Sequence, residues 1–285
     1  MTTDIYAVMG HPVSHSKSPR IHGLFAEATN QKLEYTAIQA PLDGFEASVK
    51  AFFDRGGKGL NVTVPFKEQA WNLAQQHTLR AAKAGAVNTL YRDDAGQLVG
   101  DNTDGAGLVT DLVHIHKVTL AGRKVLVLGA GGAVRGVLGP LLAQQPQQLC
   151  IANRTLAKAQ ALAELFADEA GQTDISACGF DAVGGDGDGE SDGSAGFDVI
   201  INGTSASLAG DLPPLNPSVI APHTVAYDMM YGPEITPFNR WALEHGAAAA
   251  HDGLGMLVEQ AAESFLVWRG VRPESTAVIE ALRLG

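Results

Sequence analysis

The sequence predicts an α/β protein in two parts, each with a sheet covered by helices. Short apolar segments alternate with amphipathic helical segments along the chain, which is typical of mainly parallel sheets. The apolar run Val125–Leu128 leads straight into a glycine-rich turn that opens a helix. The 285 residues suit two ordinary domains, and a hydrophobic content of 45% can fill a sizeable core in each.

The first hundred residues predict strands and helices in alternation. Strands are expected at 5–10, 33–40 and 59–65, helices at about 19–30, 43–55 and 67–83, and paired strands in AVNTLYRD and QLVGDN. A helix from Gly105 to about His116 leads into the second part. There we expect helices at 132–144, which Pro140 should kink or end early, and 155–170, and strands at 174–180, 197–202, 224–229 and 247–253. The segment 255–268 is expected to be helical.

The turn after Val125–Leu128 carries the chemistry of the second part. Its residues, Gly129, Ala130, Gly131, Gly132 and Ala133, precede a helix whose free N–H groups can hold a pyrophosphate. At the end of the next strand, where NAD-binding domains carry Asp or Glu, this chain has Asn153, Arg154 and Thr155. A carboxylate would repel a 2′-phosphate, whereas a guanidinium can pair with it bidentately.

These features predict a Rossmann-type, doubly wound domain that binds NADP(H), and hence hydride transfer. Two alternatives compete: a glycine turn of another α/β fold, since position 134 is Val instead of Gly, and a solvated surface charge at Arg154. The net charge of −11 argues against nucleic acid or an anionic membrane as a partner. An anionic cofactor must therefore meet local basic groups, here Arg154 and Lys158.

The cysteine content also bears on the cellular compartment of the protein. The two cysteines, Cys150 and Cys178, fall in expected strands and are interpreted as reduced core thiols; a disulfide or a metal pair is the alternative. We expect a cytoplasmic protein without a metal site. The segment GGDGDGESDGSAG at 184–196 is too polar to order itself and is expected to be a loop. Calcium binding by its acidic residues is the alternative, but the spacing of a known calcium loop is missing.

Polar residues stand out in two N-terminal segments. Ser16 and Ser18 lie two apart, so in an extended segment both hydroxyls would face one carboxylate; a serine-rich turn is the alternative. In LNVTVPFK, alternation puts Asn61 and Thr63 on one face of a strand and the valines on the other. Lys67 follows this strand, and a solvated lysine is its ordinary alternative.

Three more polar residues have competing interpretations. Asn88 in AGAVNTL is either a site residue or a strand residue that satisfies its own backbone. Asp104 in GDNTDG precedes a helix, so it is either catalytic or a helix N-cap. Met256 and Gln260 are four apart on one helix face, and Gln260 can equally be an ordinary flanking residue.

The chain resembles the shikimate dehydrogenase family over nearly its whole length. The motifs GHPVSHSKSPRIH, NVTVPFKE, AGAVNTL, GDNTDG, VLVLGAGGA, NRT, INGTS, YDMMY and DGLGMLVEQAA follow in the family's order and approximate spacing. The resemblance implies a substrate domain formed by 1–104 and 254–285, and an NADP-binding domain at 105–253. It implies reversible reduction of 3-dehydroshikimate to shikimate by NADPH in aromatic amino-acid biosynthesis.

The resemblance also implies a role for each matching residue. Lys67 and Asp104 would form the catalytic pair. Substrate would be bound by Ser16 and Ser18 at its carboxylate, with Tyr231 nearby, and elsewhere by Asn61, Thr63, Asn88 and Gln260. Cofactor contacts would come from the glycine turn, from Asn153, Arg154, Thr155 and Lys158, and from Gly253 and Met256. Lys158 stands where many relatives have arginine, which predicts a looser preference for NADP.

The chemistry of these side chains fits that implication. One lysine and one aspartate among neutral donors and acceptors suit a small, hydroxyl-rich monocarboxylic acid, and an ammonium can stabilise and protonate a developing alkoxide. Two rivals stay open: a quinate/shikimate dehydrogenase that uses NAD(P), and a non-catalytic ligand-binding module. We expect no nucleic-acid or membrane partner, and a monomer or homodimer.

Overall fold

The computed structural model describes residues 3–183, 196–204 and 211–284. The chain divides into two compact units: unit 1 comprises 1–107 and 257–285, and unit 2 comprises 108–256. The sequence placed the domain boundaries after 104 and 253, close to these junctions. The acidic segment expected to form a loop, 184–196, lies outside the described residues except for Gly196.

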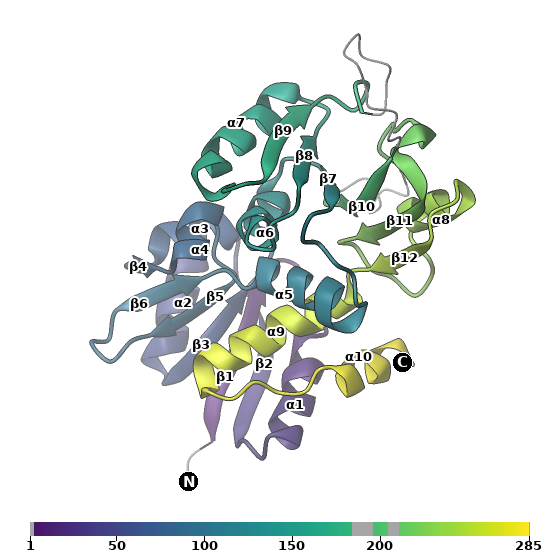
Figure 1. Cartoon of the computed structure of the whole chain (residues 1–285). Coiled ribbons are helices and arrows are strands. Elements are labelled where there is room, and N and C mark those ends of the chain that lie inside the picture. The colour runs from purple at the N-terminus through teal and green to yellow at the C-terminus, as the bar shows by residue number, and fades with distance from the viewer. Residues whose placement is uncertain (1–2, 184–195, 205–210, 285) are drawn as a thin grey trace. The chain divides into compact units, whose positions relative to one another are not determined.

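Unit 1 is an α/β unit around one six-stranded sheet with the strand order β2-β1-β3-β5-β6-β4 (Figure 1). Its strands are β1 (Asp4–Gly10), β2 (Leu33–Gln39), β3 (Gly57–Val62), β4 (Gln76–His77), β5 (Thr89–Arg92) and β6 (Leu98–Asp101). Its helices are α1 (Ser18–Ala28), α2 (Phe45–Asp54), α3 (Lys67–Leu73), α4 (Leu79–Ala84) and α10 (Thr276–Arg283). Helices α5 (Asp104–Thr110) and α9 (Leu254–Arg269) contain the two junctions.

The sheet of unit 1 is mainly parallel and is buried on both faces. Strand β1 pairs in parallel with β2 and β3, and β4 with β6, whereas β5 runs antiparallel to β3 and β6. On one face, Met9 and Leu60 pack against α2 and α3. On the other, Tyr6 and Tyr35 pack against Trp268 of α9. Because Val8 pairs with Asn61, the Asn61 side chain shares this second face.

Unit 2 has an all-parallel, six-stranded sheet with the order β12-β11-β10-β7-β8-β9 (Figure 1). This is the doubly wound order, with the reversal beside the first strand. Its strands are β7 (Lys124–Leu128), β8 (Gln148–Ala152), β9 (Asp174–Cys178), β10 (Phe197–Asn202), β11 (Ile220–Asp228) and β12 (Ala249–Asp252). Its helices are η1 (Asp111–Ile115), α6 (Gly132–Leu142), α7 (Leu156–Phe166), η2 (Ala167–Glu169), η4 (Pro217–Val219) and α8 (Pro237–Glu244).

The continuous apolar run of β7 reflects burial on both faces of this sheet. Val125 and Val127 pack in a core with residues of α6 and α7. Leu126 and Leu128 pack in another with Phe238 of α8. Cys150 and Cys178 belong to this second core as free thiols whose Sγ atoms lie 3.3 Å apart.

The helices expected from the sequence need two corrections, and one further expectation is met. The single helix expected at 67–83 is two helices with β4 between them, because Thr78 caps α4 and Gln76 pairs with Val99. Helices α8 and α10 were not predicted as separate elements. The predicted early end of the helix at 132–144 is confirmed, since α6 ends at Leu142, shortly after Pro140.

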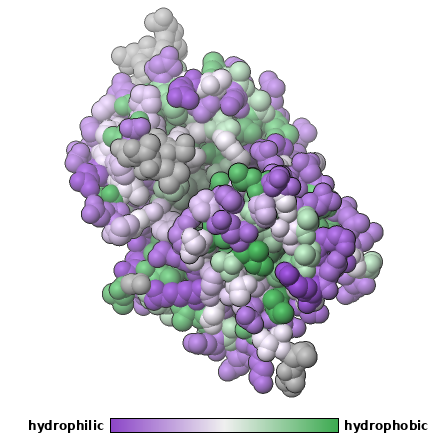
Figure 2. All heavy atoms as spheres, turned by 180° about the vertical axis from the view of Figure 1, so that it is seen from behind, coloured by the Kyte–Doolittle hydropathy of each residue, from purple (hydrophilic) through white to green (hydrophobic). Residues whose placement is uncertain are grey.

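The face of the molecule in Figure 2 carries mostly hydrophilic side chains, with hydrophobic ones in small separate groups. Scattered apolar exposure of this kind is ordinary for a folded chain. Among the described helices, none has both the length and the apolar character that a membrane crossing requires.

Candidate active site

Lys67 and Asp104, far apart in sequence, form an ion pair in unit 1. Lys67 is the first residue of α3 and Asp104 the first of α5. The Lys67 Nζ atom lies 2.5 Å from Asp104 Oδ2, with side-chain exposures of 30% and 12%. Lys67 is therefore not a freely solvated lysine. Asp104 is a helical residue and not the N-cap, so its carboxylate is directed to other side chains.

The amide of Asn88 fixes the other oxygen of this carboxylate. Asn88 Nδ2 donates to Asp104 Oδ1 at 2.8 Å and to Thr103 Oγ1 at 2.9 Å. Asn88 Oδ1 accepts from the Thr103 backbone N–H at 2.9 Å. Both ends of the amide are thus engaged, and Asn88 does more than satisfy its own backbone. The carboxylate of Asp104 is held between a cation and an amide.

The residues before Asp104 hold its backbone in place through hydrogen bonds. Asn102 Oδ1 accepts from the Asp104 backbone N–H, and Asn102 Nδ2 donates to the carbonyl of Ala86. Asp101 accepts two hydrogen bonds from the Arg80 guanidinium. Burial alone would raise the pKa of Asp101, but hydrogen bonds and charge from Arg80 outweigh burial and lower it. The GDNTDG motif therefore works mostly as a buried support.

Asn61 is buried at 6% exposure, because α9 covers its face of the sheet. Asn61 Oδ1 accepts from the Tyr35 hydroxyl at 2.7 Å, and Asn61 Nδ2 lies 3.0 Å from Ser264 Oγ. The expected alternation in LNVTVPFK is wrong beyond this strand: β3 ends at Val62, and the chain turns as the Phe66 N–H bonds the carbonyl of Thr63. Val64, expected on the buried face, is 68% exposed.

Ser16 and Ser18 do not lie in the extended segment that the sequence suggested. The Ser16 N–H closes a turn onto the carbonyl of Val13, and Ser18 is the first residue of α1. Ser16 Oγ accepts from the Ser18 backbone N–H at 3.2 Å. The turn interpretation is therefore correct for the backbone, and it brings the two residues into direct contact.

Gln260 joins the same network from α9. Its Oε1 atom lies 3.3 Å from Asn88 Nδ2 and 3.4 Å from Thr103 Oγ1. Sequence reasoning missed Thr103 and Ser264, whose hydroxyls link Asn61 to Asn88 in the buried interior. Ser264 follows Gln260 by one helical turn, and that spacing could have indicated it.

The glycine turn of unit 2 presents an open helix terminus. Gly129 has φ +105°, a conformation that side-chain-bearing residues rarely adopt. Gly131 and Gly132 are exposed, and a Cβ at either would meet nothing within 4 Å. Helix α6 has no side-chain cap, so the first-turn N–H groups offer an anion site. This cradle of backbone amides fits a pyrophosphate.

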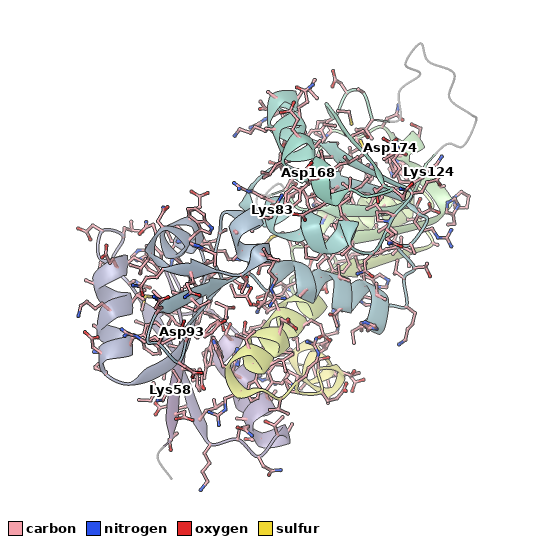
Figure 3. The ribbon with its side chains drawn as sticks, turned by 60° about the vertical axis from the view of Figure 1, so that its left-hand side comes forward. Lys58, Lys83, Asp93, Lys124, Asp168 and Asp174 are labelled. Atoms are coloured by element: carbon pink, nitrogen blue, oxygen red, sulfur yellow. The ribbon has the colours of Figure 1, made fainter. Side chains whose placement is uncertain are left out.

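The residues expected at the 2′-phosphate follow β8, at the carboxyl ends of the strands, where the glycine turn follows β7. Asn153 Nδ2 donates to the carbonyl of Thr155, and Thr155 is the N-cap of α7. Arg154 and Lys158 are exposed, and within the described part of the chain neither forms an ion pair. Lys124 and Asp174 are the first residues of β7 and β9, so they mark the amino ends of these strands (Figure 3). The exposed, positively charged side chains of Arg154 and Lys158 fit a phosphate.

Three further predicted site residues lie in unit 2. Gly253 is required by packing, since a Cβ there would lie 2.2 Å from the carbonyl oxygen of Met229. Met256 is buried in the core that contains α6. Tyr231 is half-buried after β11, so it belongs to a different unit from the other predicted substrate residues, and burial raises its pKa. Among the described residues, no group of three His, Cys, Asp or Glu could hold a metal ion.

Sequence comparisons identify relatives along the whole chain. Family profiles match at 8–90 (shikimate dehydrogenase substrate binding domain), 111–181 (shikimate / quinate 5-dehydrogenase) and 253–283 (shikimate 5′-dehydrogenase C-terminal domain). A shikimate dehydrogenase (NADP(+)) of Marinobacter nauticus is 62% identical over 283 residues, 99% of each chain.

Solved structures agree with this similarity. An Ael1 enzyme from Pseudomonas putida is 48% identical with a TM-score of 0.89, and the match covers 98% of both chains. Shikimate 5-dehydrogenase from Thermus thermophilus, solved with NADP(H) and shikimate, is 31% identical with a TM-score of 0.84 over 99% of both chains. The fold class and the two-part organisation are those of these relatives.

Proposed function

Because the chain belongs to the shikimate dehydrogenase family, we propose that it catalyses the reversible, NADPH-dependent reduction of 3-dehydroshikimate to shikimate. It is then an NADP-dependent oxidoreductase of the shikimate pathway, acting on a CH–OH group. The observation that carries the proposal is the Lys67–Asp104 pair, 2.5 Å apart and partly buried. Its support is the 62% identity to an enzyme named for this NADP-dependent activity.

Unit 1 takes the substrate in this proposal. Ser16 and Ser18 hold the carboxylate through hydroxyl donors at the start of α1. Asn61, Thr63, Asn88 and Gln260 bind or support the ring hydroxyls. All of these groups are neutral, which suits a substrate whose hydroxyls both donate and accept. The role of Tyr231 stays a prediction from its motif.

Lys67 handles the proton of the reaction. Reduction of the ketone places negative charge on its oxygen, and the ammonium of Lys67 stabilises that charge and donates the proton. In the reverse direction a neutral Lys67 accepts the proton of the hydroxyl. Asp104 keeps Nζ in place through its 2.5 Å contact, and Asn88 keeps Asp104 in place at 2.8 Å. The pair is therefore positioned before substrate binds.

Unit 2 takes the cofactor. NADPH, when bound, supplies the hydride. The turn Gly129–Ala133 holds the pyrophosphate on the first amides of α6, because Gly131 and Gly132 leave space for it. Arg154, with Asn153, Thr155 and Lys158, takes the 2′-phosphate. Gly253 and Met256 are assigned to the same cofactor.

The proposal extends to the setting of the enzyme. Its partner is a small hydroxylated acid, and it acts in the cytoplasm as a monomer or homodimer. The two free thiols, Cys150 and Cys178, suit a reducing compartment. The quinate/shikimate branch that uses NAD(P) is the second candidate, and the exposed Arg154 weighs against it because it favours a 2′-phosphate.

Purified protein mixed with 3-dehydroshikimate and NADPH tests the proposal directly. We expect the NADPH absorbance to fall with time and shikimate to accumulate in equal amount. The Asp104→Asn variant is the control for contaminating activity, since it removes the charge that holds Lys67. Absence of turnover by the wild-type protein would overturn the proposal and favour a binding module.

A further inference from the structure

The hydroxyl of Tyr35 lies among residues of the proposed substrate site, although no motif includes it. Tyr35 is the third residue of β2 and is only 9% exposed. Its Oη atom donates to Asn61 Oδ1 at 2.7 Å. Such a contact between two buried groups is costly to leave unmade.

The ring of Tyr35 is held by stacking on a neutral histidine. The His22 ring lies 4.1 Å from that of Tyr35 with an interplanar angle of 5°. Burial lowers the pKa of His22 to about 3, so this ring is uncharged near neutral pH. His22 follows Ser18 by one turn of α1. The stacked rings therefore connect β2 to the helix that begins with Ser18.

The orientation of the Asn61 amide follows from its neighbours. Its Nδ2 atom faces three acceptors: the carbonyl of Asn88 at 3.1 Å, Thr89 Oγ1 at 3.1 Å and Ser264 Oγ at 3.0 Å. A backbone carbonyl cannot donate, so the nitrogen must point there and the oxygen must point to Tyr35. The amide hydrogens are fully used. The Oδ1 atom is held in its orientation by the phenol of Tyr35.

The protonation state of the Tyr35 phenol follows from its burial. Burial raises the pKa of Tyr35 well above 10, and a hydrogen bond from the Ser18 side chain partly offsets this effect. The phenol is therefore protonated near neutral pH and can donate to Asn61. Asn61, the hydrogen-bond partner of the phenol, is itself 6% exposed.

We propose that Tyr35 is a positioning residue that fixes the orientation of the Asn61 amide, and so matches the site to a rigid cyclic acid with a hydroxyl that meets Asn61. The phenol of Tyr35 donates to the oxygen of Asn61 at 2.7 Å, and its ring stacks on His22, one turn after Ser18 on α1. The inference rests on the proposed function, in which Asn61 meets a hydroxyl of the substrate. Tyr35 acts through Asn61, and its role requires no contact with the reacting atoms.

The Tyr35→Phe variant removes the hydroxyl and keeps the ring that stacks on His22. We expect the KM for shikimate to rise about tenfold, the effect of losing one buried hydrogen bond. The KM for NADP⁺ and kcat should stay within about threefold of wild type, because Lys67, Asp104 and unit 2 are untouched. Tyr6→Phe is the matched control: Tyr6 is 2% exposed in the neighbouring strand and bonds Arg269. Its shikimate KM should match wild type.

A double-mutant cycle with Asn61→Ala tests the route of the effect. If Tyr35 acts through Asn61, adding Tyr35→Phe to Asn61→Ala should raise the shikimate KM by less than about threefold more. Three results would overturn the inference: an unchanged shikimate KM in Tyr35→Phe, an equal rise in the KM values for shikimate and NADP⁺, or full multiplication in the double mutant. Thermal unfolding of each variant identifies any that fails to fold, and Tyr35→Phe then decides alone.

Calorimetric titration with shikimate keeps this inference apart from the proposed function. A wild-type protein that binds shikimate without turning it over contradicts only the proposed activity, and weaker binding by Tyr35→Phe would still support the positioning role. A wild-type protein that does not bind shikimate contradicts both.

Discussion

The two units treat their polar groups in opposite ways. In unit 1 the candidate site is a closed network: Asn61 and Asn88 are buried, and both ends of each amide are bonded to other side chains or backbone. In unit 2 the candidate site is open. Gly131 and Gly132 are exposed, and the first N–H groups of α6 have no side-chain cap. Arg154 is exposed as well.

This difference follows from the charge of the proposed ligands. A hydroxylated ring is nearly neutral, so it is recognised by direction, and buried groups of fixed orientation provide direction. Phosphates are strongly charged and are attracted from a distance, so exposed cations and helix amides suffice. Unit 1 should therefore depend on geometry, whereas unit 2 should depend on charge.

The largest effect is expected at Lys67, where geometry and proton transfer meet. Lys67→Ala should reduce kcat about a thousandfold, because it removes the proton donor and the charge beside the alkoxide. The affinity for NADPH, measured by fluorescence titration, should stay near wild type. Lys58→Ala is the control, since Lys58 is an exposed lysine in β3 of the same unit (Figure 3). Equal losses of turnover and NADPH affinity would make Lys67 structural.

The second effect concerns stability. Arg80→Met leaves the buried Asp101 carboxylate without its cation and should destabilise the fold by about 3 kcal/mol. Arg154→Met removes an exposed charge and should change stability by less than about 0.5 kcal/mol. Urea unfolding at pH 7 measures both. Equal effects of the two changes would break the contrast between a closed and an open site.

The Arg80 effect has a defined pH dependence. The pKa of Asp101 is lower in the folded chain than in the unfolded chain, where Asp titrates near about 3.9. The pair therefore stabilises the fold above about pH 4 and loses this contribution as pH falls through the folded-state pKa. The stability difference between wild type and Arg80→Met should shrink below pH 4; a constant difference would contradict it.

A third effect tests the charge dependence of unit 2. Arg154→Ala should raise the KM for NADP⁺ about thirtyfold, the contribution of charged hydrogen bonds to a phosphate. The KM for NAD⁺, which lacks that phosphate, should stay within about twofold. Arg240→Ala on α8 is the control, because Arg240 is an exposed arginine of the same unit. A parallel rise in both KM values would remove the 2′-phosphate assignment.

The smallest effect is expected at Lys158. Lys158→Arg replaces a point charge with a planar fork that can bind a phosphate through two hydrogen bonds. The preference for NADP⁺ over NAD⁺, as a ratio of kcat/KM, should rise about threefold. No change would mean that Lys158 lies outside the reach of the phosphate.

The same contrast explains what could be predicted from the sequence. Unit 2 could be predicted from local signals, because the apolar run of β7, the glycine turn and the apolar stripe of α6 follow one another in the sequence. Helix α8 was not predicted, because its burial depends on contacts with β11 and β12. Helix boundaries at 67–83 failed where Thr78 caps a second helix inside a polar stretch.

The network of unit 1 depends on contacts between distant residues. Asn61 meets Ser264 across 203 positions, and no periodicity in either segment indicates this pairing. The extended-segment argument for Ser16 and Ser18 failed because a turn precedes α1. The competing interpretations of Lys67 and Asp104 could be separated only by their 2.5 Å contact.

We infer that unit 1 recognises one acid by geometry, whereas unit 2 recognises one cofactor by charge. Initial rates with shikimate or quinate, each with NADP⁺ or NAD⁺, test it most directly. We predict the highest kcat/KM for shikimate with NADP⁺, with separate losses on changing either the acid or the cofactor. Equal or higher kcat/KM for quinate with NAD⁺ would contradict the account.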